Sequence, residues 1–370
     1  KLINITHEQN YYFEYFEKFY EDKKIDLVIS RPDSMIGFAL TSIAKEKNIP
    51  VTFQLPTRSE GYIFWPYGAY NSEDQFKKYL IDKKLNGKVP SNKHEPFWAD
   101  TNAQKIIMDS LLLKTLINDI IFIFKDRINW LYKDFKRGKL GKRVSIISKI
   151  KFKIKAYLDN KFFNKLFETD LDIITSKPFV YFPLPMEPEY NTHSLAKEFI
   201  NIHAMIQQSA ISLPSGYNLV LKEHKPNIGL KDRDFYLGLM KLPNIIFAHY
   251  NIPGPNLVKE AKSIITISGT TALEAAELGK KAVIFGSSIE YMHLSNIIIA
   301  HSMRNLPSAL QESIQELTIK QREEVLFEIN FLKESYKDLG FYAPNTPAFQ
   351  GKLNHIEDDQ VKKAVKLLID

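Results

Sequence analysis

The segment ITISGTTALEAAELGKKAVIFG, residues 265–286, contains the pattern that decides the fold of this chain. An apolar run ends in the polar turn Ser268–Thr271, a helix of small residues follows at once, and a second apolar run occupies 281–286. This order of strand, turn, helix and strand predicts one βαβ unit of a parallel sheet. Because open parallel sheets bind ligands at the carboxyl ends of their strands, we expect a ligand at the turn.

The same alternation extends in both directions from this segment. Short apolar runs bounded by turn formers predict strands, and amphipathic stretches between them predict helices. In the second half the predicted strands are 178–185, 217–224, 244–249, 263–268 and 281–286, and the predicted helices are 193–214, 232–243, 256–261, 271–279 and 308–338. In the first part the predicted strands are 24–30 and 51–56, and the predicted helices are 7–22 and, after a loop, part of 31–50. This alternation predicts an α/β protein with two doubly wound parallel-sheet domains.

Composition and pattern divide the chain into four regions. We expect an N-terminal α/β domain over 1–103, a basic helical insertion over 104–177, a C-terminal nucleotide-binding α/β domain over 178–345 and a tail or helix over 346–370. The chain starts at Lys1 rather than at Met, so an N-terminal domain truncated at its start is one expectation. The sequence contains no cysteine, which excludes a disulfide scaffold, a thiolate zinc site and a cysteine nucleophile, and suits a reducing cytoplasm.

Positive charge is concentrated in the middle of the chain. Residues 104–166 hold 16 Lys and Arg against 5 Asp, whereas the whole chain has a formal net charge of +7. One interpretation is a helical insertion that packs on the first domain and leaves its lysines in water. The other is a basic, aromatic-bearing surface that contacts an anionic membrane or an anionic glycan through the lysines of 149–155. Nucleic acid is not expected as a partner, because no recognition motif accompanies the charge.

The polar turn of the first segment is a candidate phosphate site. Gly269 lets the backbone approach a ligand closely, and the hydroxyls of Ser268, Thr270 and Thr271 add donors. Glu274 stands three residues after Thr271, which predicts a capping box at the start of the helix. A well-capped helix without a ligand is the alternative interpretation.

Polar residues also follow or end two other predicted strands. Lys222 and His224 end the strand of 217–224 and share one face of it, because side chains alternate along a strand. Both are candidates to neutralise a phosphate, and solvated polar side chains are the alternative. Glu189 follows the strand of 178–185 in a Pro-rich loop, where a carboxylate can orient a sugar or accept a proton. Three polar strand ends at one edge of a sheet favour a ligand site.

Four stretches together resemble a known family. They are VYFPLPMEPE, LPSGYNLVLKEHKP, FYLGLMKLPNIIF and ITISGTTALEAAELGKKAVIFG, which occur in this order within 180–286. Their order and spacing resemble the successive signatures of the bacterial capsule polysaccharide biosynthesis family, which is similar to the β-Kdo transferases of capsule assembly. The resemblance implies a GT-B-like fold in which the C-terminal domain holds the nucleotide.

The resemblance also implies roles for individual residues. It places Lys222 and His224 at the counterpart of a His-Pro signature that contacts the nucleotide phosphate, although here a lysine separates His224 from Pro226. It places Ser268–Thr271 at the phosphate-holding turn and Glu189 at an acidic loop. With cations and backbone donors at the phosphate, we expect neither a metal nor a cofactor.

The acceptor is expected to enter from the first domain. Polar and aromatic residues follow the predicted strands there, and we expect Arg58, Tyr62 and Trp65 to contact the acceptor. Transfer also requires a carboxylate that deprotonates the acceptor or assists at the anomeric carbon. The candidates for this catalytic carboxylate are Glu60, Asp33 and Glu189.

These features predict a metal-independent glycosyltransferase of surface polysaccharide synthesis, cytoplasmic and peripheral at the inner face of the membrane. The expected partners are a nucleotide-sugar donor, such as a CMP-linked ulosonic acid, and a glycan or glycolipid acceptor. Two alternatives remain open: a nucleotide-sugar epimerase on the same scaffold, and a non-catalytic glycan-binding protein of capsule assembly. Asp170 and Asp172 spell the D-x-D of metal-dependent glycosyltransferases, but they lie between the predicted domains, so no metal site is expected there.

Overall fold

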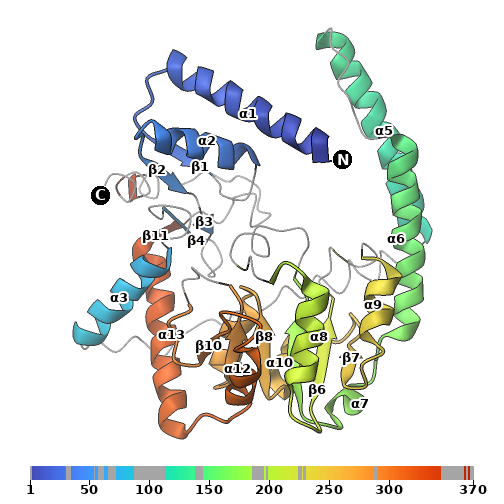
Figure 1. Ribbon diagram of the computed structural model, residues 1–370, viewed down its shortest axis with the longest axis vertical. Helices are drawn as coiled ribbons and strands as arrows, with labels where there is room; N and C mark the ends of the chain where they lie inside the picture. The colour runs from blue at the N-terminus through green and yellow to red at the C-terminus, as the bar shows by residue number, and fades with distance from the viewer. Residues whose placement is uncertain are drawn as a thin grey trace.

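The computed structural model describes residues 2–30, 35–53, 55–56, 62–65, 72–86, 113–137, 145–185, 196, 199–223, 227, 231–286, 291–342, 362–363 and 366. Its largest element is a six-stranded parallel sheet formed within residues 179–299. Helices cover this sheet, and the N-terminal part of the chain lies beyond one end of it (Figure 1).

The six-stranded sheet is doubly wound. Its strands are β5 (Phe179–Pro183), β6 (Asn218–Lys222), β7 (Ile245–Phe247), β8 (Ser263–Thr266), β9 (Ala282–Ile284) and β10 (Ile297–Ile299). They pair in the order β10-β9-β8-β5-β6-β7, and every pair is parallel. The chain starts in the middle at β5, winds outward to β7, returns to β8 and winds outward to β10. The prediction of a doubly wound parallel sheet is confirmed for this part of the chain.

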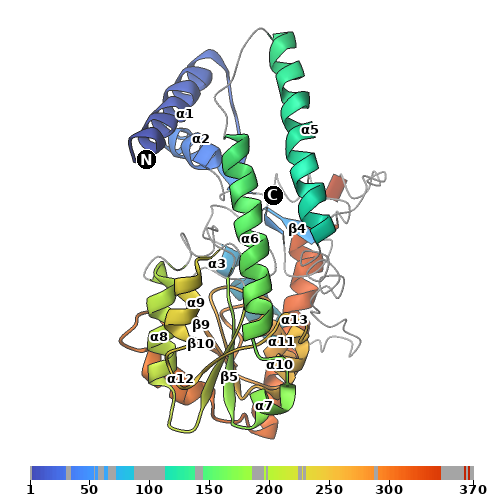
Figure 2. The ribbon, with the colours of Figure 1, turned by 90° about the vertical axis from the view of Figure 1, so that its right-hand side faces the viewer.

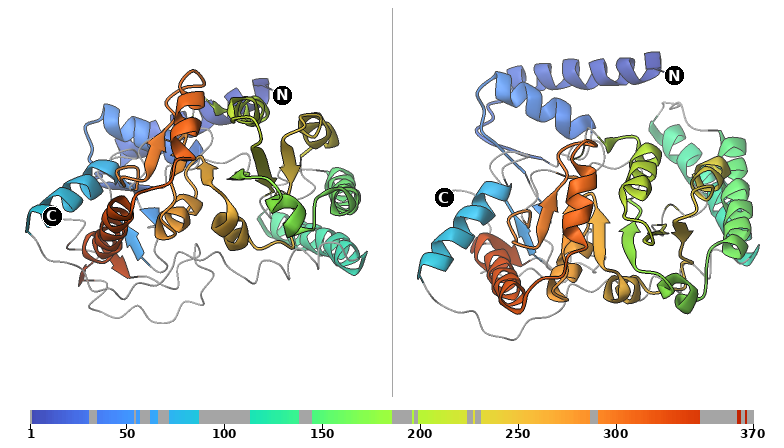
Figure 3. Two further views of the ribbon diagram at one scale, coloured as in Figure 1. Left: turned by 90° about the horizontal axis from the view of Figure 1, so that it is seen from below. Right: turned by 60° about the horizontal axis from the view of Figure 1, so that its bottom comes forward.

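Both faces of the sheet are buried because its strands carry apolar side chains on both sides. In β5, Val180 and Phe182 pack on one face, whereas Phe179 and Tyr181 pack on the other. The first face is covered by α8 (Ile202–Ser212), α9 (Arg233–Leu239) and α12 (Leu306–Ser313), and the second by α7 (Leu171–Thr175), α10 (Gly254–Glu260), α11 (Thr271–Glu277) and α13 (Ile319–Leu339). Figure 3 shows helices on both sides of the strands.

Two features of this region differ from the sequence prediction. The helix predicted at 193–214 begins only at Ile202, where the Asn201 side chain accepts a hydrogen bond from the N–H of Ala204 and caps the helix. The sequence pattern also does not predict β10. β10 is the edge strand beside β9, and its three isoleucines are only partly buried.

The first part of the chain forms a smaller α/β unit. The parallel pair β1 (Val28–Ser30) and β2 (Val51–Phe53) contacts α2 (Met35–Glu46), which in turn packs on α1 (Leu2–Asp22). The core of this unit contains Tyr20, Val28, Ile43 and Ala44. The strand predicted at 51–56 is divided, because β2 joins this pair and β3 (Leu55–Pro56) joins a separate antiparallel sheet.

That antiparallel sheet brings distant parts of the chain together. β3 and β11 (Gly340–Tyr342) flank β4 (Tyr62–Phe64), a strand that the sequence pattern does not predict. β11 follows α13 directly, within the region predicted as the C-terminal domain, yet it pairs with the first part of the chain.

Aromatic packing reinforces this connection. The ring of Phe76, on α3 (Ser72–Asn86), lies with its centroid 5.1 Å from that of Phe64 and 5.3 Å from that of Tyr336 on α13. Nearby, the Tyr79 hydroxyl donates to the Asp338 carboxylate at 2.5 Å. Helix α13 therefore links the small sheet to the large one.

Two long helices form a hairpin along one flank of the molecule. α5 (Leu113–Arg137) packs on α6 (Ile146–Leu166), and α5 reaches past the sheet domain (Figure 2). Lys149 pairs with Asp126 at 3.6 Å and Lys153 pairs with Asp119 at 2.8 Å, which is the register of an antiparallel pair. None of the helices in the described ranges is both long and apolar enough to cross a membrane.

The C-terminal turns of α6 anchor the hairpin to the sheet domain. The ring of Phe163 is buried, with its centroid 4.2 Å from that of Tyr236 on α9 and 5.3 Å from that of Phe167. Aromatic pairs at these separations stabilise the contact beyond simple burial.

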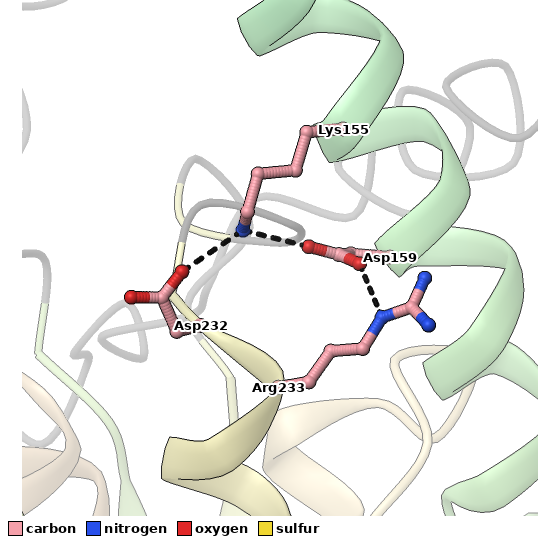
Figure 4. A network of polar contacts seen from close by, with 4 residues as sticks. All are labelled: Lys155, Asp159, Asp232 and Arg233. Atoms are coloured by element: carbon pink, nitrogen blue, oxygen red, sulfur yellow. Dashed lines mark hydrogen bonds and ion pairs between the residues drawn. The ribbon is translucent and has the colours of Figure 1, made fainter.

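Charged groups next to these rings form a small network (Figure 4). Lys155 donates to Asp159 at 2.8 Å and lies 3.1 Å from Asp232, and Arg233 donates to Asp159 at 2.6 Å. Burial by itself raises the pKa of Asp159, but the hydrogen bonds from Lys155 and Arg233 outweigh it and hold the pKa below its ordinary value. The network joins α6 to the start of α9.

We expect Phe163→Ala to lower the free energy of unfolding by about 3 to 5 kcal/mol, because it leaves a cavity between α6 and the sheet domain. The matched control is Phe122→Ala on α5, where the ring is 68% exposed. Its expected effect is within about 0.5 kcal/mol. Urea unfolding followed by circular dichroism measures both variants, and equal losses in the two would contradict the anchoring role of Phe163.

Candidate functional site

The polar turn lies where the winding of the sheet reverses. The connection after β5 leads to β6 on one side, and the connection after β8 leads to β9 on the other. In doubly wound sheets, ligands bind outside the carboxyl ends of the two strands at this reversal. Ser268, Gly269 and Thr270 lie just beyond the end of β8, and Thr271 begins α11.

Hydrogen bonds on both sides hold the backbone of this turn. The Gly269 N–H donates to Thr266 Oγ1 at 3.0 Å, and the Tyr291 hydroxyl donates to the Gly269 carbonyl at 2.9 Å. A Cβ atom added at Gly269 would lie 2.7 Å from Thr266 Oγ1, closer than such atoms approach. Glycine is therefore required by this close approach, and the N–H of Gly269 is already used within the turn.

The start of α11 differs from the predicted capping box. Its N-cap is Thr270, whose side chain makes no capping hydrogen bond, and α11 has only seven residues. Thr270 has helical backbone angles, φ −59° and ψ −17°, whereas a capping side chain normally requires an extended N-cap residue. The N–H groups of Thr270 and Thr271 donate to no other described residue, so they remain available to a ligand.

Glu274 is the residue of this site that the sequence analysis misjudged. Its side chain is only 7% exposed, and among the described residues it has no hydrogen-bond or ion-pair partner. Burial, with a smaller contribution from the charge of Glu277, raises the pKa of Glu274 to about 7. The signal was an acidic residue inside the small, apolar helix TALEAAE, where a buried position is more natural than a cap.

Tyr181 lies near this carboxyl. Burial, and then the charge of Glu274, raises the pKa of the Tyr181 phenol, so the two groups are close although they share no hydrogen bond. Gly254, the first residue of α10, is also near, because a Cβ atom added there would lie 3.8 Å from the Tyr181 hydroxyl. Ionisable groups whose pKa is shifted by burial and by a neighbouring charge are frequent at functional sites.

Lys222 ends β6 at the same edge of the sheet. It pairs in register with Pro183 of β5, and continuing the β5–β8 register places Thr266 level with both. Since neighbouring strands are about 4.8 Å apart, the backbones of Lys222 and Thr266 are separated by roughly 10 Å. The two predicted phosphate-binding stretches therefore end at one edge, with one strand between them.

The Lys222 ammonium has a structural contact in this arrangement. It donates to the Ile252 carbonyl at 2.6 Å. His249 lies close to Lys222. Its Nε2 hydrogen-bonds Asn164, and its Nδ1 accepts from the Asn251 N–H. Burial lowers the pKa of His249, and the charge of Lys222 lowers it further. Lys222 thus helps to fix the loop after β7, in addition to any role toward a phosphate.

Glu223 separates the two predicted phosphate ligands in sequence and is itself buried. Its carboxylate accepts from Lys231 at 2.9 Å through both oxygens and from the Tyr236 hydroxyl at 2.6 Å. This fully paired group joins the end of β6 to Lys231 and to Tyr236 of α9. The contact is structural, and the alternation along β6 explains why Glu223 faces the core opposite to Lys222.

Several predicted site residues lie outside the described residues: His224, Glu189, Asp33, Arg58 and Glu60. Of the predicted acceptor-side residues, Tyr62 begins β4 and Trp65 directly follows it, both half-buried. Tyr62 is therefore part of the antiparallel sheet, and Trp65 lies directly beyond its end.

The D-x-D motif has a structural role. Asp170 caps α7 by accepting from the N–H of Asp172, and its own N–H donates to Glu168. No group of three or more potential metal-ligating side chains occurs in the described ranges.

Fold and site together define a doubly wound α/β protein with a candidate ligand site at the reversal of its sheet. No family model matches the sequence. Protein FixF of Sinorhizobium fredii is 28% identical over 143 residues, which are 38% of this chain and 34% of that relative. The match thus spans about a third of the relative's length.

Two solved structures show a distant likeness. KpsC of Thermosulfurimonas dismutans, a β-Kdo 2,7 transferase, matches with a TM-score of 0.39 and 10% identity, covering 86% of this chain and 89% of that one. The UDP-GlcNAc 2-epimerase of Neisseria meningitidis, bound to UDP-GlcNAc, matches with a TM-score of 0.34 and 16% identity, covering 90% and 80%. Both TM-scores are too low to define a common fold, and neither assigns a reaction to this chain.

The raised pKa of Glu274 predicts a pH-dependent stability. The pKa of this carboxyl is ordinarily 4.5 and is about 7 in the folded protein, so the folded state binds the proton more tightly than the unfolded state does. The stability from the protonated carboxyl is fully present below about pH 4.5 and is lost as the pH rises through about 7. Glu274→Gln keeps the group neutral. Between about pH 5 and about pH 8, the native protein should lose about 2 to 3 kcal/mol of its free energy of unfolding that the Glu274→Gln variant keeps.

Urea unfolding of both proteins at the two pH values measures this difference. A difference that does not change with pH would show that Glu274 is solvated or paired in solution.

Proposed function

We propose that this chain is a glycosyltransferase that transfers a sugar from a nucleotide-sugar to a glycan or glycolipid acceptor. The observation that carries the proposal is the position of Ser268–Thr271 at the reversal of the sheet, beside the largely buried Glu274, whose carboxyl has no partner among the described residues. The sequence resemblance to the capsule polysaccharide biosynthesis family over 180–286 supports the same reaction. On that basis the donor is a CMP-linked ulosonic acid and the product a surface polysaccharide.

The proposed ligand of the turn is the donor phosphate. The N–H groups of Thr270 and Thr271 have no acceptor among the residues that the structure describes, and the hydroxyls of the turn add further donors. Because α11 is short, these individual donors contribute more than a helix dipole does. Fixed donors of this kind stabilise the negative charge that develops on the leaving phosphate when the bond to the anomeric carbon breaks. Lys222 supplies a cation at the same edge of the sheet.

The proposed partner of Glu274 is the ribose of the nucleotide. A buried carboxylate without donors is unfavourable, and two adjacent hydroxyls supply the hydrogen bonds that the protein does not. Binding of the diol would favour the ionised carboxylate and lower the pKa of Glu274.

The proposed acceptor site is formed by the first part of the chain. Tyr62 and Trp65 are its described candidates, together with Arg58, and a carboxylate among Glu60, Asp33 and Glu189 takes the proton of the attacking hydroxyl. The proposed setting is the cytoplasm, where nucleotide-sugar donors are used. No metal or other cofactor is part of the proposal.

A thermal-shift measurement with CMP, CDP, UDP and GDP tests the nucleotide site. A ligand at about a hundred times its dissociation constant stabilises the folded state by about 2.7 kcal/mol, which raises the melting temperature by several degrees. We expect Thr270→Ala to weaken the binding of the preferred nucleotide about tenfold or more, because it removes a donor to a charged group.

The matched control is Thr175→Ala. Thr175 is also half-buried, but it ends α7 at the opposite edge of the sheet, where its hydroxyl donates to the Leu171 carbonyl. The control should bind the nucleotide like the native protein. Equal losses in the two variants would contradict a site at the turn.

The ribose contact is tested with 2′,3′-dideoxy analogues of the preferred nucleotide. The native protein should discriminate against the analogue, and Glu274→Gln should lose most of that discrimination. Product analysis then separates the reactions: conversion of a sugar nucleotide without an acceptor indicates an epimerase. The absence of a shift with every nucleotide would favour a non-catalytic glycan-binding protein.

A further inference from the structure

One side of α5 is an exposed apolar stripe. Its members recur every three or four residues, so they lie along a single side of the helix, and each is between 45% and 66% exposed. They are Leu113, Ile117, Ile121, Phe124, Ile128 and Leu131. Contiguous exposed apolar surface of this length is unusual for a protein surface and marks a contact with another phase or molecule.

Helix α6 extends the same surface. Ile147, Ile154 and Leu158 are exposed and recur at helical spacing. By helical periodicity, the apolar stripes of both helices lie away from the side on which Lys149 and Lys153 pair with Asp126 and Asp119. The antiparallel hairpin therefore has one side with ion pairs and another that is apolar.

Basic residues border the apolar side. The two helices carry twelve Lys and Arg against four Asp. Lys149, Lys153 and Lys155 are engaged in ion pairs within the protein, so the lysines that the sequence analysis singled out are mostly paired. Lys125 on α5 and Lys151 on α6 instead flank the stripes by their helical positions.

We propose that this side of the hairpin binds the surface of a membrane that contains anionic lipids, with α5 lying in the interface. A helix with an apolar side, basic flanks and too little apolarity to span a bilayer is the type that lies in the headgroup region. The lysines attract anionic headgroups while their stems lie along the apolar surface.

The charge of the hairpin argues against a second copy as the occupant. Two copies meeting through these stripes would bring two strongly basic surfaces together, whereas anionic lipids neutralise the same charge. The hairpin also projects past the sheet domain (Figure 2), and the side chains of the α5 stripe are exposed.

Co-sedimentation with vesicles tests the apolar contact. The vesicles are phosphatidylcholine alone or phosphatidylcholine mixed with phosphatidylglycerol. We expect binding to the mixed vesicles, and a loss of about tenfold or more in Ile121→Gln/Ile128→Gln, because two buried side chains are removed from the interface. The matched control is Phe122→Gln, an equally exposed residue of α5 that lies outside the stripe, and it should bind like the native protein.

The electrostatic contact is tested separately with lysine variants. Lys125→Gln/Lys151→Gln should weaken binding to the mixed vesicles by about fivefold per lysine and reduce its salt dependence. Lys153→Gln is the control, because Lys153 pairs with Asp119, and it should have a smaller effect.

Three results would overturn the proposal. They are equal binding to neutral and mixed vesicles, binding unchanged in Ile121→Gln/Ile128→Gln, and a dimer in light scattering that this variant dissociates. The nucleotide-induced thermal shift of the native protein should persist in all these variants, so a failure here is distinguishable from a failure of the proposed reaction.

Discussion

Strand β5 is buried on both faces and paired on both edges, with β6 on one side and β8 on the other. The sheet can wind in opposite directions only from such a central strand. The reversal places the loops after β5 and β8 next to each other, and Ser268–Thr271 lies in one of them. The location of the candidate site is thus a consequence of the strand order, and the apolar side chains of β5 that pack on both helical layers maintain that order.

The site combines a backbone held by hydrogen bonds with polar groups that form no hydrogen bond to the described residues. Tyr291 and Thr266 hold the turn at Gly269, whereas the N–H groups of Thr270 and Thr271 and the carboxyl of Glu274 have no described partner. Donors held in place before a ligand arrives lose little free energy to reorganisation, which is the basis of electrostatic stabilisation in enzymes. Glu223 provides the contrast, because its carboxylate is also buried but is fully paired, and it joins the end of β6 to Lys231 and α9.

The parts outside the large sheet are attached to it by specific contacts. α13 leads into β11, which pairs with β4, so the acceptor-side candidates Tyr62 and Trp65 are held at the same sheet as the end of α13. On the other flank, α6 is anchored by Phe163 and by the Asp159 network, whereas α5 is held by α6. The basic segment is therefore attached to the sheet domain and not to the first domain, and Lys149, Lys153 and Lys155 are paired instead of lying free in water, so the first interpretation of its charge is wrong on both points. Contact with a membrane stays a proposal.

The sequence by itself determined five of the six strands of the large sheet, most of the helices between them and the position of the polar turn, because buried parallel strands and the helices between them have strong apolar patterns. It did not determine the division of 51–56 between two sheets, the strand β4, or the end of α13 in a distant sheet, because short strands depend on partners far away in the chain. Only the tertiary structure showed that Glu274 is largely buried without a partner among the described residues, that Glu223 is paired, and that most lysines of 149–155 form ion pairs. Burial and pairing depend on what packs against a side chain, which local sequence does not record.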